Sequence, residues 1–420
     1  MAFFDTIYQM TFFDLSHGYQ PFKDPNLHFD WVEKNLKNVF LPTSKAMTNG
    51  YVKRGVQVQG WTLEAWMNST EETQALAETV ISNLKIAESK KYIEFGFSGY
   101  SHPILPILTD DLIRLQLIFD YNAVTKHLGA PTWFWPPEGA ININLLKILY
   151  ELYPKTIVVV PDISVNRRNF SGFVKIMHED GRYQKAFISN NILKDILMNA
   201  IFYEHNPYKD ITIDWDDIQN IYTEKGRFYR LLQEINTPDP VILTRDWENA
   251  GSVKGLIPTD NGGLEHLSLM DNSFTFKLPS EASWDNAETI DIKDIVPGCW
   301  ETDASPNNPY IYWRPNKESD YWKNIPLIKQ IWVNKWNEYI DEFNDRFSVF
   351  IGKNGGIDTI VNDSKLSNDT KQMIAGLLSC VPWHFLANPQ WGPDQSFSMA
   401  AWENICKPSR EMLLNLTNTE

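Results

Sequence analysis

The sequence predicts an α/β protein with a mostly parallel sheet, closed into a barrel or doubly wound, and a helical C-terminal region. Strand-like apolar runs alternate with helical stretches over most of the chain, which is the pattern of a parallel sheet. The chain has 420 residues, of which 43% are hydrophobic, and this suits one large barrel with an appendage. The character of the sequence changes after about Ser273, and from about Tyr321 it becomes helical.

The first part of the chain predicts two strands and a helix. The segment MAFFDTIYQMTFF is apolar but lacks a basic region, and Asp5 interrupts it, so we expect a core strand rather than a signal peptide. Residues 92–97, YIEFGF, read as a second strand. Residues 110–129 predict a helix, because apolar residues recur at helical spacing, two aspartates stand at its start and Gly129 at its end.

The alternation continues beyond this helix. Residues 132–135 (TWFW) predict a strand, residues 144–153 (NLLKILYELY) a helix and residues 156–160 (TIVVV) a β-branched strand. Residues 240–244 (PVILT) predict another buried strand.

The last third of the sequence has a different composition. Residues 299–315 are rich in Pro, Asn and aromatic residues, and we expect a long ordered loop there. Residues 327–343 carry an apolar stripe, and residues 365–380 follow a Ser/Asn capping signal, so both predict helices.

The composition excludes several classes of ligand. The formal net charge is −15 and runs of Lys and Arg are missing, so the attraction that drives binding to nucleic acid or anionic membrane is absent. The three cysteines (Cys299, Cys380 and Cys406) are far apart and form no CxxC, which argues against a disulfide framework and a thiolate zinc site. No apolar run approaches the ~18 residues of a membrane span, so we expect a soluble, cytoplasmic protein.

Polar residues stand where several predicted strands should end, namely His17, Glu94, Glu138 and Asp246. In barrel enzymes the reactive groups lie at the carboxyl ends of the strands. Two carboxylates brought together from different strands would suit cleavage of a glycosidic bond. From local sequence alone, a glutamate after Pro-Pro is most often a helix N-terminal residue, and Asp246 is as easily an ion-pair partner of Arg245.

Other chemistries have weaker support in the sequence. A metal site at His17 and His102 lacks HxH or HExxH spacing, and neither a phosphate-binding loop nor a GxSxG elbow is present. The 16 Trp and 17 Tyr favour a carbohydrate ligand, because aromatic faces stack on sugar rings. Buried packing explains most of these aromatic residues equally well.

Four segments, taken in order, resemble glycoside hydrolase family 57, the retaining α-glucan-active enzymes. Residues 16–21, SHGYQP, look like the family's N-terminal HxHQP segment, with His17 and Gln20 retained and Tyr19 in place of the second histidine. Residues 92–108, YIEFGFSGYSHPILPIL, look like its second region, and Glu94 and His102 fall on the family's Glu and His.

The other two segments carry the catalytic carboxylates that the resemblance implies. Residues 134–141, FWPPEGAI, are similar to the WPPEGS-type region, whose glutamate is the nucleophile, here Glu138. Residues 242–250, ILTRDWENA, are similar to the DGEN-type region, whose aspartate is the general acid/base, here Asp246. Trp247 stands where the family often has glycine.

The resemblance spans roughly residues 10 to 250 and implies an incomplete, TIM-like (β/α)7 barrel followed by a C-terminal helical bundle region. We expect a barrel domain over residues 1–315 and a helical domain over residues 316–420 that contributes to the substrate cleft. In this helical domain, residues 376–386 resemble the family's fifth, aromatic-rich region, with Pro382 where an acidic residue is common.

The resemblance implies an α-glucan or malto-oligosaccharide substrate and a retaining mechanism that needs no cofactor and no metal. We expect Arg245 to point away from Asp246, because adjacent strand residues face opposite sides. The remaining candidates are expected to hold or stack on sugars: His17, Tyr19, Gln20, Glu94, His102, Trp135, Trp247, Glu248 and Trp383.

Three alternatives to hydrolysis stay open at this point. An α-glucan transglycosylase would use the same carboxylates, and a non-catalytic glucan-binding homologue would keep them as sugar contacts. A metal-dependent polysaccharide deacetylase would need an Asp and two close-set histidines. The linkage attacked, the preferred chain length and the oligomeric state are not fixed by the sequence.

Overall fold

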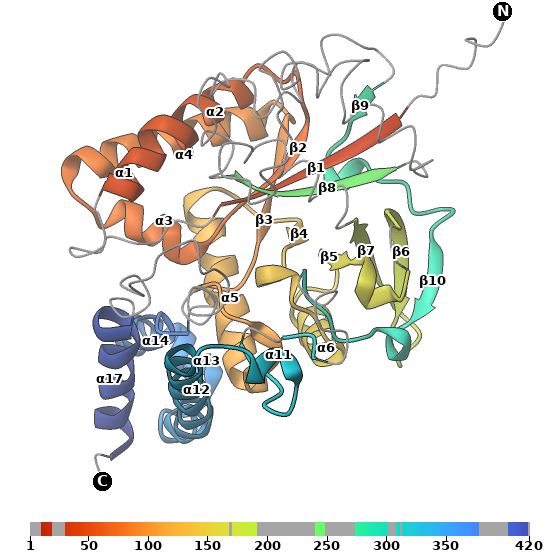
Figure 1. Ribbon diagram of the computed structural model, residues 1–420. Coiled ribbons are helices and arrows are strands. Elements are labelled where there is room, and N and C mark those ends of the chain that lie inside the picture. The colour runs from red at the N-terminus through yellow and green to blue at the C-terminus, as the bar shows by residue number, and fades with distance from the viewer. Residues whose placement is uncertain are drawn as a thin grey trace, which may run out of the picture.

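A curled sheet forms the centre of the protein (Figure 1). The computed structural model describes residues 10–18, 30–167, 170–190, 240–247, 274–300, 308–310, 313–377 and 402–418. Seven neighbouring strands are parallel and follow one another in the order β8 (Val241–Asp246), β1 (Met10–Gly18), β2 (Arg54–Val58), β3 (Ile93–Phe97), β4 (Trp133–Phe134), β5 (Ile157–Pro161) and β7 (Tyr183–Ser189).

Three further strands complete the described sheet. The strand β6 (Gly172–Met177) pairs antiparallel with β7, and β10 (Glu288–Asp291) extends this edge parallel to β6. The short strand β9 (Phe274–Phe276) pairs with the start of β1.

The sheet curls so far that its two edges approach each other. The backbone N–H of Ile242 on β8 donates to the hydroxyl of Ser171, just before β6, at 2.7 Å. The ring of Phe13 lies edge-on to Phe173 and tilted against Phe187, with centroids 5.3 and 5.2 Å apart. Nearly sequential strand order and curling of this kind belong to a barrel, whereas a doubly wound sheet reverses its order at a switch point. The predicted incomplete (β/α)7 barrel is therefore confirmed.

Side chains rather than solvent fill the inside of the barrel. The indole of Trp133 lies directly over the backbone of Gly55 on β2 and Gly96 on β3, where an added Cβ would come within 2.9 and 2.4 Å of the ring. Glycine is required at both positions because no other residue leaves room for this indole. The residues of this inner core are Phe13, Leu15, Trp133, Trp135, Ile157, Val159, Phe187 and Ile242.

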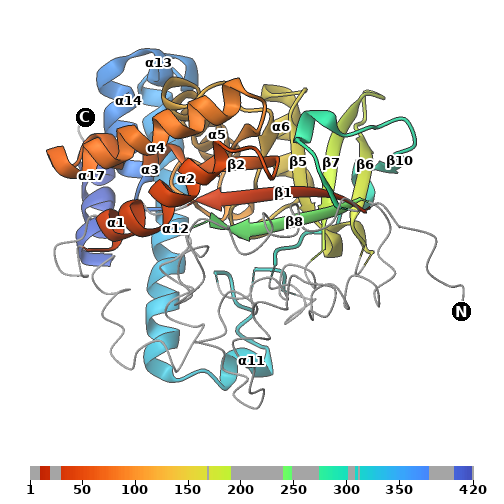
Figure 2. The same cartoon turned by 90° about the horizontal axis from the view of Figure 1, so that it is seen from above.

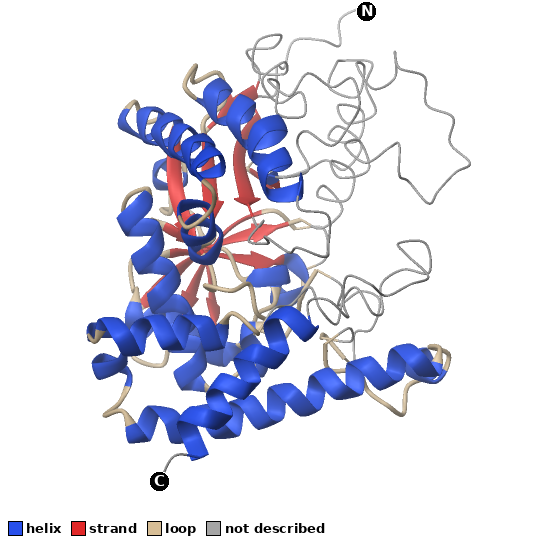
Figure 3. Cartoon of the chain, turned by 90° about the vertical axis from the view of Figure 1, so that its left-hand side faces the viewer, coloured by secondary structure: helices blue, strands red, loops and turns tan. Residues whose placement is uncertain are grey.

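Helices cover the outer face of the strands (Figure 3). Those between β1 and β5 are α1 (Asp30–Asn35), the π-helix η1 (Leu36–Phe40), α2 (Leu41–Met47), α3 (Gly60–Met67), α4 (Glu71–Ser89), α5 (Asp110–His127) and α6 (Ile143–Leu152). The Thr70 hydroxyl caps α4, and the Asn142 side chain caps α6 by accepting from the N–H of Leu145 at 2.8 Å. The predicted strands at 92–97, 132–135, 156–160 and 240–244 and the helices at 110–129 and 144–153 are thus confirmed, with ends shifted by a few residues.

The C-terminal helices lie at the side toward which β1 points (Figure 2). They are α11 (Asp320–Lys323), α12 (Leu327–Lys353), α13 (Ile357–Asn362), α14 (Ser364–Ile374), the π-helix η11 (Trp402–Cys406) and α17 (Lys407–Asn418). The predicted helices that begin near residues 327 and 365 are confirmed, although Asp363 rather than Ser or Asn caps α14. No helix in the described part of the chain is long and apolar enough to cross a bilayer.

Candidate active site

The carboxyl ends of the parallel strands meet at one end of the barrel, and the main candidate residues lie there. His17 is next to last in β1, and Asp246 is the last residue of β8. His102 and Glu138 stand in the segments that follow β3 and β4. Reactive groups collect at this end of a barrel because the loops that leave the strands are held by a rigid sheet.

Asp246 shares the inner face of the barrel with His17. The two residues are partners in the register of β1 and β8, as are Phe13 and Ile242, which belong to the inner core. Since every second residue of a strand faces the same side, Asp246 faces inward like Ile242. Arg245 faces outward, as expected from the alternation, and its guanidinium binds both oxygens of the buried Asp14 at 2.8 and 2.7 Å.

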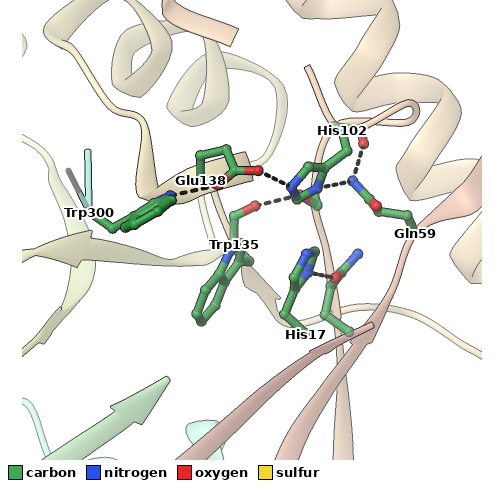
Figure 4. A network of polar contacts seen from close by, with 9 residues as sticks. His17, Gln59, His102, Trp135, Glu138 and Trp300 are labelled. Atoms are coloured by element: carbon green, nitrogen blue, oxygen red, sulfur yellow. Dashed lines mark hydrogen bonds and ion pairs between the residues drawn. The ribbon is translucent and has the colours of Figure 1, made fainter. Parts of the chain in front are cut away.

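Three rings are stacked beside this strand end (Figure 4). The imidazole of His17 lies parallel to the indole of Trp135, with centroids 5.4 Å apart and an interplanar angle of 3°. The imidazole of His17 also stacks on that of His102, with ring centroids 4.8 Å apart. The Nδ1 of His17 is 2.5 Å from the side-chain oxygen of Gln57, which orients the ring.

The carboxylate of Glu138 is held by two ring N–H groups (Figure 4). Nε2 of His102 lies 3.1 Å from Oε1, and Nε1 of Trp300 donates to Oε2 at 2.6 Å. The Glu138 side chain is 20% exposed, whereas His102 is buried. The two oxygens are thus held by different rings, one by His102 and the other by Trp300, and these contacts fix the direction of the carboxylate.

The segment that carries Glu138 is rigid. The N–H of Trp135 continues the ladder from β4 by donating to the Phe97 carbonyl at 2.9 Å, and two prolines follow. Beyond Glu138, the chain pairs with the loop at 298–300: Ile141 and Gly298 exchange backbone hydrogen bonds, and the N–H of Trp300 donates to the Glu138 carbonyl at 3.2 Å. The same loop thus fixes both the backbone and the carboxylate of Glu138.

Both partners of the His102–Glu138 contact have left-handed backbone conformations. His102 has φ 57° and Glu138 has φ 56°, and the described residues include only two other non-glycine residues with positive φ, Lys91 and Asn166. This conformation costs an L-residue about 1–2 kcal/mol, and such residues gather at functional sites. The strain supports a functional role for this pair.

A buried carboxylate connects two segments that support the network, by which we mean the polar and stacking contacts around Glu138, His102 and His17. Asp120 on α5 accepts the backbone N–H of Gly60 and of Ser98, each at 2.5 Å, next to Gln59 and to the end of β3. Burial raises the pKa of Asp120 to about 7, although the two N–H groups oppose this shift.

Glu94 does not lie with the other candidates, and the expectation that it holds sugar hydroxyls there is not supported. It is the second residue of β3, near the amino end of the barrel. Its carboxylate accepts the N–H of Ser280 at 2.9 Å, the Ser280 hydroxyl and the Thr132 hydroxyl. Because the motif match follows sequence and not strand position, it could not show at which end of β3 the carboxylate would lie.

The expectation that Trp247 offers a stacking surface for sugars is wrong. Its indole is 1% exposed, and its Nε1–H donates to the Thr43 hydroxyl at 2.8 Å. The ring lies edge-on to Phe40 at 4.8 Å. Trp247 follows Asp246, which faces inward, so the alternation of the strand directs the indole outward into the helical layer.

Four predicted residues, Tyr19, Gln20, Glu248 and Trp383, lie outside the residues that the structure describes. Most of the predicted loop at 299–315 lies outside them as well.

Gln57, Gln59 and Trp300 contact the network but were not among the predicted site residues. The two glutamines alternate with valines at the end of β2, and polar residues at the end of a buried strand could have indicated them. Trp300 follows Glu138 by 162 positions, and only the folded chain brings it to the carboxylate.

Metal-ligating side chains do not gather anywhere in the described part of the chain. No group of three or more His, Cys, Asp or Glu residues has the arrangement of a metal site there.

Fold and site together define a barrel protein with inward-facing or partly exposed carboxylates at the carboxyl ends of its strands. The protein belongs to glycosyl hydrolase family 57, whose family model matches residues 6–221, just over half of the chain. The recognition from the four sequence segments is therefore confirmed, and with it membership of a family that acts on α-glucans.

Solved structures of the same fold belong to enzymes with several different activities. An α-amylase from Thermotoga maritima has a TM-score of 0.65 at 12% identity, with 97% of this chain and 92% of that chain covered. A family 57 branching enzyme from Thermococcus kodakaraensis has a TM-score of 0.60 at 15% identity, with 98% and 95% covered. The TM-scores establish the shared fold, and sequence identities this low leave the activity of this protein open.

The 4-α-glucanotransferase from Thermococcus litoralis is a longer relative. It has a TM-score of 0.62 at 14% identity, and this chain, 98% of which is covered, spans 60% of its length. A search of curated proteins gave no match.

Proposed function

We propose that the protein is a retaining α-glucan glycosidase in which Glu138 is the nucleophile and Asp246 the general acid/base. The observation that carries the proposal is the Glu138 carboxylate, held by His102 and Trp300 at the end of the barrel where β8 also ends in Asp246. Two carboxylates from different strands are what double displacement at a sugar requires.

In the first step, a Glu138 oxygen attacks the anomeric carbon while the glycosidic C–O bond breaks. Asp246 gives its proton to the departing oxygen. In the second step, Asp246 takes a proton from water or a sugar hydroxyl, whose oxygen attacks the same carbon and frees the Glu138 carboxylate. Retention by this route needs the two carboxyl groups about 5–5.5 Å apart.

His17, His102 and Trp135 are the described candidates for contacts with the sugar, because their stacked rings lie beside both carboxylate-bearing segments. Tyr19, Gln20, Glu248 and Trp383 remain candidates on their sequence alone. We also propose that the region from residue 316 onward borders the substrate site, since Ser101, next to His102, donates its hydroxyl to the Ile374 carbonyl of α14 at 2.8 Å.

The test compares the wild type with Glu138→Gln and Asp246→Asn on maltoheptaose and soluble starch, with products separated by chromatography over time. Both variants should lose roughly 10³-fold or more of the activity. Glu94→Gln is the matched control, because it makes the same chemical change at the other end of the barrel, and it should stay within about threefold of the wild type.

The products decide between related activities. Shorter sugars alone make the protein a hydrolase, while products both longer and shorter than maltoheptaose make it a transglycosylase with the same two carboxylates. A wild type that changes neither sugar contradicts the proposal, and a glucan-binding homologue without activity then becomes the better account.

The roles of the two carboxylates can be separated with azide, a small nucleophile that needs no general base. Glu138→Ala with azide and an activated α-glucoside should give the β-glycosyl azide, because azide takes the place of the nucleophile and attacks the sugar from the face opposite the leaving group. Asp246→Ala should give the α-glycosyl azide through the covalent intermediate. The same anomer from both variants would contradict these assignments.

A further inference from the structure

Gln59 connects the network to the barrel through both hydrogens of its side-chain amide. The residue directly follows β2 and is completely buried. Its Nε2 lies 2.9 Å from the Gly99 carbonyl oxygen and 2.8 Å from Nδ1 of His102 (Figure 4).

The Gly99 carbonyl fixes which way round the amide stands. A carbonyl oxygen can only accept, so the amide oxygen of Gln59 cannot take this position and the nitrogen must. The same carbonyl accepts the backbone N–H of His102 at 3.0 Å, which closes the turn that presents the imidazole. The orientation of the Gln59 amide is therefore decided by the turn itself.

The second amide hydrogen then decides the tautomer of His102. A hydrogen that points at Nδ1 needs a lone pair there, so Nδ1 carries no proton and the neutral ring carries its proton on Nε2. This N–H faces Oε1 of Glu138 at 3.1 Å. A proton on Nδ1 would set two donors against each other at 2.8 Å.

We propose that Gln59 is a positioning residue that holds His102 as the neutral Nε2–H tautomer, so that His102 orients the Glu138 carboxylate without neutralising its charge. The proposal rests on the proposed function, in which Glu138 is the nucleophile. A neutral donor aligns the attacking oxygen and leaves its negative charge in place. An imidazolium would bind the carboxylate as an ion pair and weaken it as a nucleophile.

The groups around His102 agree with this assignment. Among the described residues, the titratable groups in contact with its ring include Glu138, whose Oε1 lies 3.1 Å from Nε2, and His17, stacked at 4.8 Å. His17 is bound through Nδ1 to the side-chain oxygen of Gln57, which lies in β2 two residues before Gln59. The two glutamines thus serve the two stacked imidazoles separately, one through its oxygen and the other through its nitrogen.

The test is the tautomer of His102 in the full-length protein, read from the imidazole nitrogens by long-range ¹H–¹⁵N correlation with ¹⁵N-labelled histidine. The sequence has eight histidines, and the signals of His102 are those that disappear in His102→Asn. The wild type should show a pyridine-like Nδ1 and a pyrrole-like Nε2. A wild type with a protonated Nδ1 overturns the proposal without any variant.

Two variants of Gln59 test the cause. Gln59→Leu keeps the size but removes the donor, and Gln59→Glu replaces it by an acceptor, so in both the Nδ1 signal should move toward the protonated type. Gln57→Leu is the matched control, because it removes the partner of His17 and should leave the His102 signals unchanged. A wild-type pattern for His102 in both Gln59 variants would show that another group fixes the ring.

The catalytic consequence is measured separately on maltoheptaose. Gln59→Leu should lower kcat roughly tenfold or more and change KM less than about threefold. The reason is that the variant loses the alignment of the Glu138 carboxylate but keeps the contacts that bind the substrate. A changed tautomer with wild-type kcat would overturn the role in positioning. Since the tautomer is measured without substrate, its outcome stays separate from a failure of the α-glucan assay.

Discussion

Glu138 has a backbone conformation that glutamate rarely adopts, with φ 56° and ψ 21°. The following Gly139 has φ 61°, so two successive residues are left-handed, and only the second is of the type that takes this conformation without cost. The hydrogen bonds from His102 and Trp300 hold the side chain that this turn presents.

This conformation predicts an unusual order of stability among variants. Glu138→Gly should be about 1 kcal/mol more stable than Glu138→Ala, because glycine has no Cβ to strain in the left-handed region. Urea denaturation of the two variants measures the difference, and both lack the carboxylate and its hydrogen bonds. An alanine variant as stable as the glycine variant would mean that the turn relaxes once the carboxylate is gone.

Two tryptophans should separate catalysis from stability. Trp300→Phe removes the N–H that binds Oε2 of Glu138 and should lower kcat roughly tenfold. Trp247→Phe removes the buried donor to Thr43 and should reduce the free energy of unfolding by about 1–3 kcal/mol with kcat near the wild type. Steady-state kinetics and denaturation of both variants measure this, and the opposite pattern would reverse the two roles.

The residues that could be predicted are those whose chemistry follows from a local pattern. Glu138 and His102 stand in specific strings, and Asp246 ends a recognisable strand. Trp247 was misplaced because an indole beside a candidate acid fits a cleft and a core equally well, and only the strand alternation decides between them. Gln59 and Trp300 depend on contacts across 43 and 162 positions, which periodicity does not contain.

Helix α5 determines much of the site although it carries none of the proposed catalytic groups. Through Asp120 it binds the start of α3 and the end of β3. Through Gln116 it binds the backbone N–H of Ser101 at 3.0 Å and the Ser101 hydroxyl at 2.9 Å. The turn that presents His102 is therefore fixed from the helix as well as from the sheet.

The raised pKa of Asp120 predicts a loss of stability as the pH rises. Below pH about 4 the carboxyl is protonated in the folded and the unfolded chain, and its contribution is fully present. As the pH rises through about 7, the folded protein must ionise a buried carboxyl that the unfolded chain ionised earlier, so this stability is lost.

Asp120→Asn should abolish this part of the pH dependence, because the amide does not titrate. At every pH the variant loses the same amount of free energy of unfolding, because its amide nitrogen faces one backbone N–H. Between pH 5 and 8 its free energy of unfolding should rise relative to that of the wild type, by at most a few kcal/mol. Urea denaturation at several pH values measures the difference, with the exposed Glu88→Gln on α4 as the control. Parallel curves for wild type and Asp120→Asn would contradict the shift.

At the level of elements, long periodic helices and β-branched strands were predictable, and short or polar elements were not. The strand β2 mixes Arg, Gly and Gln with valine, because Gly55 makes room for Trp133 and Gln57 faces His17. No element was predicted at the hairpin of β6 and β7, where partly exposed or exposed residues alternate with buried ones along β6 and only the start of β7. These requirements come from the barrel interior and the site, so no local propensity reports them.

The barrel and the C-terminal helices share one hydrophobic core. Leu84 of α4 and Leu112 of α5 belong to the same cluster of buried residues as Phe347 of α12 and Leu413 of α17. Polar contacts reinforce the join: Lys371 of α14 binds Glu64 of α3 at 2.6 Å, and Asn344 of α12 accepts the N–H of Thr109 at 3.1 Å. The division at residue 315 stays a prediction, and the helices on its C-terminal side share the hydrophobic core of the barrel.

A shared core predicts a single cooperative unfolding transition for the whole chain. Calorimetry should give one peak, and tryptophan fluorescence and far-ultraviolet circular dichroism should report the same midpoint. Leu413→Ala, at the end of the chain, should lower this midpoint for both signals together, at a cost of about 2–5 kcal/mol. Two resolved transitions, with the variant affecting only one, would show that the two regions unfold independently.

The indole of Trp133, which packs on Gly55 and Gly96, has a consequence for how sugars would enter and leave the proposed active site. Among the described residues, the side chains of the inner core fill the barrel behind the strand ends, so we expect the donor, the leaving sugar and the acceptor of the proposed reaction all to enter and leave at the end where Glu138 lies. For the proposed double displacement, the first product has to depart before an incoming sugar can take its place above Glu138. The fold thereby imposes the order in which the sugars leave and enter. The time between departure of the first product and arrival of the acceptor sugar decides how often water reaches the intermediate first.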